Sequence, residues 1–426
     1  MKNDLLTTLS VGIDVSSKSN SVCALNFRGE IVFTCKAPNN LPGAEYIARE
    51  IINHFTEDFE SVTIALESTS YYNLHLASFL SSHESLLPLN PMVYNINAKN
   101  VSNYKQSYTD QDKTDPDDAF AIADYTRIGR IHTNPWKGTQ FLALQRLTRH
   151  RLHLVETLSR EKNYALTNIY LKFNQLNILP KDDRPFSNIF GATSMAVLSE
   201  FLSLDEITYM PLEDLVNFIS EKSKNHFVDT EHTAKLLKKA ARDSYRLDKT
   251  LYEPINTAIA SSFSIIYSIE KQLKLTDQAI IKVIKGFNTT EYQSLISIPG
   301  IGKVMAAGIL AEIGSINYFK NNDKLAKYAG ITWRQKSSGN YKAEETHMTK
   351  TGNKYLRYYL IEAADIVRKL SPEYKAYYRK KFNEVPKHQH KRALALTARK
   401  LVRLIFALLS NNRIYSSEYV GSKTIK

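Results

Sequence analysis

The sequence predicts an N-terminal α/β domain, a long antiparallel coiled-coil arm and an all-α C-terminal domain. Short β-rich runs alternate with helical stretches up to residue 136, which is typical of a layered α/β domain. Apolar residues then recur at a 3-4 spacing in two long segments, and a basic, mostly helical region follows. We therefore expect domains at 1–136, 137–290 and 291–410, and a tail at 411–426.

The α/β domain begins with a predicted three-stranded antiparallel meander over residues 9–36. The polar segments "SSKSN" and "RGE" interrupt its β-rich runs, as turns do. A helix over 43–54, a strand over 61–68, a helix beginning near Tyr71 and another strand-like run over 85–91 complete the predicted domain.

The arm is predicted from two helical segments with the apolar spacing of a coiled coil. The spaced positions are Leu144, Leu147, Leu154, Leu158 and Ala165 in the first segment, and Ile255, Ser262, Ile266, Ile269, Leu273, Ile280 and Val283 in the second. We expect the two helices to pair in antiparallel order, with Pro254 starting or kinking the second. Residues 174–231 are less regular and are interpreted as an insertion at the tip of the arm.

The segment "IPGIG" places Gly300 and Gly302 between two apolar helical stretches, just before Lys303. This pattern favours a helix-hairpin-helix, whose backbone N–H groups can face a phosphate. A plain turn between two helices is the alternative, because the motif is short.

The positive charge is concentrated at one end of the chain. Residues 319–426 hold 24 Lys and Arg against 8 Asp and Glu, whereas residues 1–136 hold 10 against 16. Aromatic residues are interspersed with the cations in "KLSPEYKAYYRKKF" (369–382), which fits a polyanion such as nucleic acid. No long apolar run or signal-peptide pattern occurs, so we expect a cytoplasmic protein without a membrane segment.

The stretch "KTDPDDAF" (113–120) crowds three carboxylates around Pro116. Asp115 suits a helix N-cap followed by proline, so Asp115 and Asp118 would share one side of the first turn while Asp117 points elsewhere. Like charges this close repel each other, which indicates that a positive partner is needed.

Two further acids stand at predicted strand ends, Asp14 after "LSVGI" and Glu67 in "VTIALE". If these strands are neighbours, both carboxylates can meet the turn that carries Asp115 and Asp118. Such a cluster would repel strongly unless divalent cations filled it, and hard oxygen ligands select Mg²⁺ or Mn²⁺. Each acid alone has an ordinary interpretation as a cap or a surface charge.

Several segments in order resemble one known family. They are "VGIDVSSKSNSVCAL", "ALESTSYY", "KTDPDDAFAIADY", "IPGIG", "YAGITWRQKSSG" and "TKTGNKYLRYYLIEAA". The resemblance is to the DEDD-type insertion-sequence transposases, the insertion sequence 110 family, also called bridge-RNA-guided recombinases. It extends from about Leu9 to Leu409.

The resemblance implies a RuvC-like (RNase H-type) domain whose D-E-D-D set matches Asp14, Glu67, Asp115 and Asp118. It also implies a nucleophilic serine before glycine in the C-terminal domain, which matches Ser338. Ser337 remains a weaker candidate, because the family often has Gln where this sequence has Ser337.

The activity implied is cutting and rejoining of DNA strands through a phosphoserine, which conserves the phosphodiester energy. Donor DNA, target DNA and a guide RNA are the implied partners, in the bacterial cytoplasm at the nucleoid. An even-numbered homo-oligomer, a dimer or a tetramer, would allow one subunit's serine to complete another's acidic site.

Cations near the serine are expected to hold the flanking phosphates. They are Arg334, Lys336, Lys350, Lys354 and Arg357, in addition to Gly300, Gly302 and Lys303 of the hairpin.

Other classes of protein fit parts of the sequence. The segment "VGIDVSS" also resembles the phosphate-binding hairpin of actin-like ATPases and sugar kinases, although no second glycine-rich phosphate loop is visible. A Holliday-junction nuclease would use the four acids and would not need Ser338. A nucleic-acid scaffold without activity would tolerate neutral substitutes for the acids.

Overall fold

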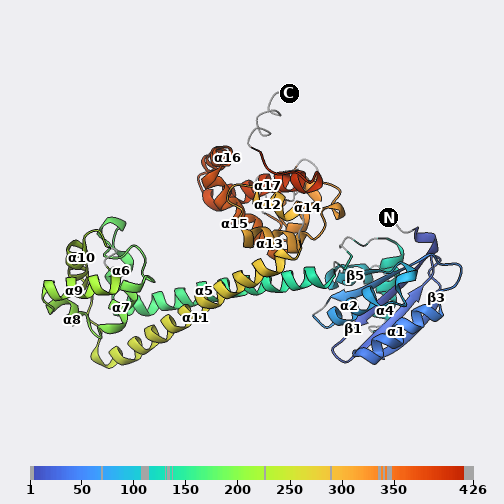
Figure 1. Ribbon diagram of the computed structural model, residues 1–426, viewed down its shortest axis with the longest axis horizontal. Coiled ribbons are helices and arrows are strands. Elements are labelled where there is room, and N and C mark those ends of the chain that lie inside the picture. The colour runs from blue at the N-terminus through green and yellow to red at the C-terminus, as the bar shows by residue number, and fades with distance from the viewer. Residues whose placement is uncertain are drawn as a thin grey trace. The chain divides into compact units, whose positions relative to one another are not determined.

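The computed structural model describes most of the 426-residue chain (Figure 1). The described residues are 4–68, 71–106, 115–129, 131, 135–136, 138–224, 227–287, 290–333, 337–338, 341–342 and 348–416. The chain divides into two compact units, and each is described by itself. The first comprises Met1–Gln145, Leu310–Thr349 and Arg399–Arg413, and the second comprises Arg146–Ile309, Lys350–Ala398 and Ile414–Lys426.

A five-stranded mixed sheet forms the centre of the first unit. Its strands are β1 (Thr8–Val15), β2 (Ser19–Leu25), β3 (Ile31–Pro38), β4 (Ser61–Ser68) and β5 (Met92–Asn97), in the spatial order β3-β2-β1-β4-β5. The first three strands form an antiparallel meander, whereas β4 and β5 run parallel to β1. The predicted α/β domain that begins with a meander is therefore confirmed.

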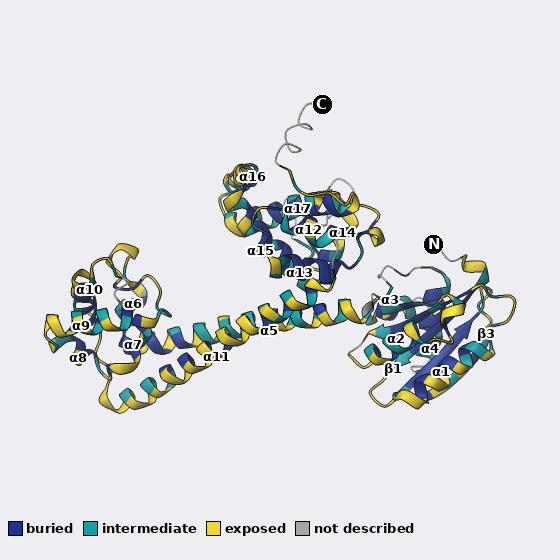
Figure 2. Cartoon of the chain, viewed as in Figure 1, coloured by how far each residue is buried: buried dark blue, intermediate teal, exposed yellow. Residues whose placement is uncertain are grey.

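Helices cover both faces of this sheet. On one face, α1 (Leu41–Asn53) and α2 (Asn73–Ser82) share a buried apolar cluster with Ile13 and Leu66. On the other face lie α3 (Ala98–Lys105) and α4 (Asp115–Arg127), where Ile122 packs on Ala65. Figure 2 shows the buried strands between helices whose outer surfaces are exposed. Side chains alternate between the two faces of a strand, so β4 supplies Leu66 to the first cluster and Ala65 to the second.

The close contact between β1 and α4 depends on Gly12. A Cβ at this position would lie 2.2 Å from the backbone nitrogen of Ala123 and 2.4 Å from the carbonyl oxygen of Ala119. Ala119 and Ala123 are one helical turn apart and have small side chains, so the backbone of α4 can approach the strand directly.

The strand predicted over 85–91 is wrong. Residues Leu87–Leu89 form the 3-10 turn η2, and β5 begins at Met92. Pro88 lies within the turn and Pro91 directly precedes the strand, and proline has no N–H to donate to a strand ladder. The helices predicted over 43–54 and near Tyr71 are α1 and α2, within two residues.

The rest of the first unit comes from short elements and from parts of three long helices. The short elements are η1 (Leu5–Thr7), η5 (Ile316–Tyr318), α14 (Asn322–Ala329), β6 (Ser337–Ser338) and β7 (Tyr341–Lys342). The long helices are α5 (Thr139–Lys172), α13 (Lys303–Ile313) and α17 (Gln389–Ser410). Arg399 of α17 bonds to Asn322 at 3.2 Å and pairs with Asp323 at the start of α14.

Two 34-residue helices, α5 and α11 (Tyr252–Lys285), lie side by side in the second unit (Figure 1). Arg151 Nε is 2.6 Å from Asp277 Oδ1, and Lys162 Nζ is 2.7 Å from Glu270 Oε1. The partner number falls as the residue number rises, so the helices are antiparallel. Pro254 lies in the first turn of α11, where a missing N–H costs no helix bond.

A helical cluster with its own apolar core joins these two helices. Its elements are α6 (Asn174–Ile178), η3 (Lys181–Asp183), α7 (Ala192–Glu200), α8 (Leu204–Tyr209), α9 (Leu212–Ser223), α10 (Thr230–Arg242) and η4 (Lys249–Leu251).

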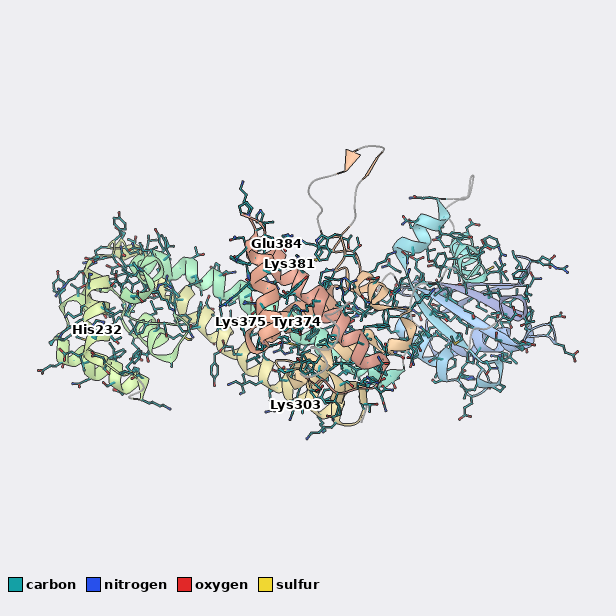
Figure 3. The ribbon with its side chains drawn as sticks, turned by 90° about the horizontal axis from the view of Figure 1, so that it is seen from above. His232, Lys303, Tyr374, Lys375, Lys381 and Glu384 are labelled. Carbon is teal, nitrogen blue, oxygen red and sulfur yellow. The ribbon has the colours of Figure 1, made fainter. Side chains whose placement is uncertain are left out.

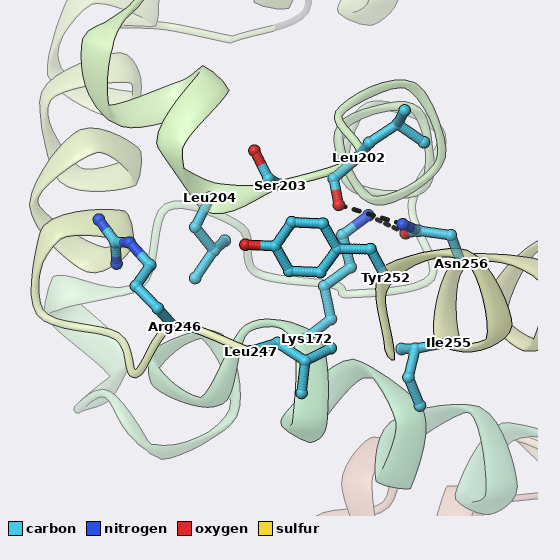
Figure 4. A pocket seen from close by; sticks show the side chains of 9 residues that line it. All are labelled: Lys172, Leu202, Ser203, Leu204, Arg246, Leu247, Tyr252, Ile255 and Asn256. Atoms are coloured by element: carbon cyan, nitrogen blue, oxygen red, sulfur yellow. Dashed lines mark hydrogen bonds between the residues drawn. The ribbon is translucent and has the colours of Figure 1, made fainter. Parts of the chain in front are cut away.

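The buried Lys172 connects this cluster to α11 (Figure 4). Its ammonium donates to the carbonyls of Leu198 at 2.8 Å and Phe201 at 2.5 Å, and to the Asn256 side chain. Burial lowers its pKa to about 8. Three acceptors match the three donors of an ammonium group, which is the condition under which a buried charge is tolerated.

Helices also form the C-terminal part of the second unit, as predicted. They are α12 (Thr290–Ile296), most of α13, α15 (Lys354–Leu370), α16 (Pro372–Asn383) and the first half of α17. Tyr359 is buried under Gly308, and its hydroxyl donates to the carbonyl of Thr148 at 2.8 Å. No helix among the described residues combines the length and apolar character needed to cross a membrane.

Replacing Gly12 with alanine is expected to displace α4, because the new Cβ would overlap backbone atoms that cannot rotate away. Overpacking of this kind costs about 1–3 kcal/mol or more. Hydrogen exchange over residues 115–127 should become faster in Gly12→Ala. Gly286→Ala is the control, since its Cβ would meet Val283 O at an ordinary 3.4 Å. Equal exchange in both variants would contradict this role of Gly12.

Candidate active site and nucleic-acid contacts

The pairing of β1 with β4 brings Asp14 beside Glu67. The parallel register runs from Thr8↔Ser61 to Ile13↔Leu66, a constant offset that matches Asp14 with Glu67 at the next position. Because alternate residues share a face, Asp14 lies on the same side of β1 as Gly12, which faces α4. The strand ends thus present both carboxylates to α4.

Helix α4 brings Asp118 to the same place. Asp118 directly precedes Ala119, whose carbonyl meets Gly12. The helix begins at Asp115, so Pro116 lies in its first turn, as the sequence indicated. The side chain of Asp115 lies outside the described part of the structure.

The pKa of Glu67 is shifted by its burial and by the charged groups around it. Burial raises this pKa above its ordinary value, Lys105 opposes the rise, and the charges of Asp14 and Asp118 add to it. Like charges raise the pKa of a carboxyl group because they disfavour its ionised form. The structure therefore brings Asp14 and Asp118 near enough to Glu67 for their charges to act on it.

Lys105 is a residue of this site that the sequence analysis missed. It is the last residue of α3, and its Nζ forms an ion pair with Asp118. The two side chains are 25% and 29% exposed, so water screens the pair less than a surface pair. No local spacing could have revealed this contact, because the partner follows 13 residues later on a separate helix.

The chemistry of these side chains fits a hard divalent cation. All the donors are carboxylate oxygens, the ligands that Mg²⁺ and Mn²⁺ prefer. Lys105 already supplies one positive charge to the group. Among the side chains that the structure describes, which omit that of Asp115, no three Asp, Glu, His or Cys groups are gathered closely enough to hold a metal ion.

The predicted nucleophile lies in a small hairpin of the first unit. Ser337 and Ser338 form β6, and Ser338 pairs with Tyr341 of β7. The base of this segment is closed by a hydrogen bond from Thr349 N to Thr332 O at 2.8 Å. The side chains of both serines, and the predicted contacts Arg334 and Lys336, lie outside the described residues.

The predicted hairpin at "IPGIG" joins α12 to α13. Gly300 has φ +99° and packs against the backbone of Val367 in α15, a combination that favours glycine. A Cβ at Gly302 would meet nothing within 4 Å, and the exposed Lys303 begins α13 (Figure 3).

Cations gather around Tyr355 at the start of α15. The Arg149 guanidinium lies 4.3 Å from the centre of the Tyr355 ring, and the Lys354 ammonium lies 5.0 Å from it. Arg357 Nη1 donates to the carbonyl of Lys350 at 2.9 Å, which connects α15 to the turn before it. Arg149 and Lys354 thus form a cationic cluster on the Tyr355 ring in the second unit, and the predicted contacts Lys350 and Arg357 flank this ring in the sequence.

Helix α16 carries a second basic surface. Lys375, Arg379 and Lys380 are exposed on it, while Tyr374 is buried beneath (Figure 3). Its acidic neighbour Glu384 is neutralised by Lys381 at 2.7 Å and also pairs with Arg392. One aromatic residue of this basic segment connects α16 to α15, since the Arg368 guanidinium lies 4.1 Å from the centre of the Tyr378 ring.

Comparison with known proteins finds transposases. A DEDD-type transposase family model matches residues 11–170, and a model described as transposase of the IS116/IS110/IS902 family matches residues 292–379. The chain is 23% identical over 415 residues to the uncharacterized 44.8 kDa protein of insertion element IS116 from Streptomyces clavuligerus, covering 95% of this chain and 96% of that protein. It is 32% identical over 126 residues to the transposase for insertion sequence element IS1111A from Coxiella burnetii, covering 29% of this chain and 34% of that protein.

Glu67→Gln is expected to stabilise the metal-free protein at pH 7. Because the folded state raises the pKa of Glu67, it binds this proton more tightly than the unfolded chain does, and ionised Glu67 lowers the free energy of unfolding. The stabilisation should fade as the pH falls through the raised pKa towards 4.5, where wild-type Glu67 is protonated. Hydrogen exchange over β4 and α4, in the presence of a chelator, measures the stability of the variant relative to wild type. Glu57→Gln, on an exposed loop, is the control, and equal effects of the two variants would refute the prediction.

Proposed function

The chain belongs to the IS110 family of insertion-sequence transposases, and we propose that it cuts and rejoins DNA strands through a serine ester of phosphate beside a metal-dependent carboxylate site. The observation that carries this proposal is that Asp14 and Glu67 end the neighbouring strands β1 and β4, where the charge of Asp118 also acts on Glu67. Separate strands and a helix supply these acids, and their mutual repulsion lowers the stability of the fold unless a cation is bound there.

Asp14, Glu67, Asp115 and Asp118 would hold the metal, Mg²⁺ or Mn²⁺. A bound ion of this kind supplies positive charge that stabilises the oxygens of a phosphate undergoing substitution. The ionised carboxylates bind and orient that ion.

Ser338 is the proposed nucleophile, with Ser337 as the alternative. Its hydroxyl loses a proton and attacks the phosphorus atom, a serine–phosphate bond forms, and the bond to one deoxyribose oxygen breaks. The leaving sugar oxygen takes up a proton. The energy of the phosphodiester is kept in the new ester, so another strand's hydroxyl can reverse the step without ATP.

Nucleic-acid contacts are proposed for the second unit and for the serine hairpin. The residues are Gly300, Gly302 and Lys303 of a helix-hairpin-helix, Lys350, Lys354 and Arg357 around Tyr355, and Arg334 and Lys336 beside the serine. The exposed cations of α16 extend this set. The positions of Arg149 and Lys354 support these contacts. Both cations lie over the Tyr355 ring, which fixes their positive charges in one place.

The proposed architecture consists of a RuvC-like domain at 1–136, a coiled-coil arm at 137–290 with an insertion at about 174–231, a transposase domain at 291–410 and a tail at 411–426. Buried Ile259, Ser262, Ile266, Ile269 and Ile280 repeat along α11 as a coiled-coil seam would. Such an arm suits a dimer or tetramer in which the serine of one subunit completes the acidic site of another.

A guide RNA encoded by the element is the proposed source of target choice, in the bacterial cytoplasm at the nucleoid. Contacts of lysine and arginine with phosphate do not read sequence, so the protein alone should show little preference among DNA sites. The excess of 24 Lys and Arg over 8 Asp and Glu in residues 319–426 supports binding to RNA as well as DNA.

The proposed reaction predicts DNA covalently attached to the protein. Purified protein, its co-purified RNA, labelled donor and target DNA, and Mg²⁺ are incubated and separated on a denaturing gel. The adduct should be lost in Ser338→Ala, Asp115→Asn and Asp118→Asn, because the first removes the nucleophile and the others remove carboxylate ligands. Ser315→Ala, in a cap of η5, is the control and should keep it. Cleaved DNA without any adduct, unchanged in Ser338→Ala, would indicate a metal-dependent nuclease instead.

The cationic cluster predicts a change in the salt dependence of binding. Replacing Lys350 and Lys354 together with alanine should weaken binding to every DNA sequence alike and lower the slope of log K against log salt by about 1–2, since each phosphate contact releases about one counterion. Lys222→Ala with Lys235→Ala is the matched control, because these lysines are paired with Glu200 and Glu231. Equal slopes for the two double variants would show that the cationic cluster does not contact DNA.

A further inference from the structure

Lys105 stands among the proposed metal ligands, yet the proposed reaction gives it no role. Its Nζ pairs with Asp118, and its charge also reaches Glu67. Most exposed ion pairs contribute little to stability and need no explanation. This pair is different because both partners are about three-quarters buried and one of them is a proposed ligand.

The fold holds Lys105 at this place through its neighbour. The hydroxyl of Tyr104 donates to Asp124 Oδ2 at 2.6 Å, and its ring meets that of Tyr125 edge to face with centroids 5.4 Å apart. Both partners are in α4, so α3 is attached to α4 one residue before Lys105. Tyr104 thus joins α3 to the second half of α4, while the ion pair of Lys105 reaches Asp118 near the start of α4.

An ammonium group and a divalent cation need the same carboxylate oxygens. While Lys105 is paired with Asp118, it offsets part of the repulsion among Asp14, Glu67 and Asp118. When a metal is bound, that compensation is no longer needed, and the lysine becomes a like charge close to the ion.

We propose that Lys105 is a positioning residue that holds Asp118 in the metal-free site and competes with the divalent cation for that carboxylate. This inference rests on the proposed function, because it takes Asp118 to be a metal ligand. It predicts two effects of removing the charge. The metal-free site becomes less stable, and the metal binds more tightly.

Titration of the full chain with Mn²⁺, without nucleic acid, tests the competition. Lys105→Met should bind Mn²⁺ about fivefold more tightly than wild type, the effect of losing a competing ion pair. Lys105→Arg should restore the wild-type affinity, since it restores the charge. Arg28→Met removes a cation from the turn after β2, at the opposite end of the sheet, and should leave the affinity unchanged.

Hydrogen exchange over residues 115–127 tests the positioning. In chelator, Lys105→Met should exchange faster than wild type, and saturating Mn²⁺ should remove the difference. Tyr104→Phe loses the bond to Asp124 but no charge, so it should exchange faster than wild type both with and without Mn²⁺.

The outcomes separate this inference from the proposed function. If wild type binds Mn²⁺ and Lys105→Met binds it equally or more weakly, the competition is refuted while the metal site stands. If wild type binds no Mn²⁺, the metal site itself is refuted, and the competition with it.

Discussion

Helix α4 can lie against the sheet only because residue 12 of β1 is glycine. A Cβ there would overlap the backbone of Ala119 and Ala123, and a helix that stood further from the strand would take Asp118 away from Glu67. The contact is between backbones, so no side-chain rearrangement could absorb the overlap. The geometry of the acidic site therefore depends on the absence of one carbon atom.

The acids themselves oppose the fold that gathers them. Burial and two like charges raise the pKa of Glu67, so an ionised carboxyl group at this position lowers the free energy of unfolding. Lys105 offsets part of this cost through Asp118, and Tyr104 attaches α3 to α4 so that the lysine stays in reach. A cation that belongs to the protein thus offsets part of the repulsion among its own acids.

The second unit handles charge differently. Lys172 is buried, but each of its donors has an acceptor, so the charge ties α5 to the helical cluster and to α11. Arg149 of α5 and Lys354 of α15 lie over the Tyr355 ring, and Lys354 is exposed, so a polyanion can reach it. A buried cation with complete hydrogen bonding is structural, whereas a gathered and accessible one is suited to binding.

Much of this arrangement was readable from local patterns. The meander, the parallel strand β4 with Glu67 near its end, the helix beginning at Asp115 and the two long helices follow from periodicity, turn residues and capping, which act over a few residues. The strand expected at 85–91 failed because its apolar character outweighed Pro88 and Pro91 in the prediction. Ser338 was indicated by family resemblance, since a serine in a polar loop has no local signal of its own.

Only the tertiary structure decided that Asp14 and Glu67 share one register position and that Gly12 admits α4. It also decided that Lys105 pairs with Asp118. These are contacts through space between separate elements, and their energies depend on packing and burial that no local sequence pattern encodes.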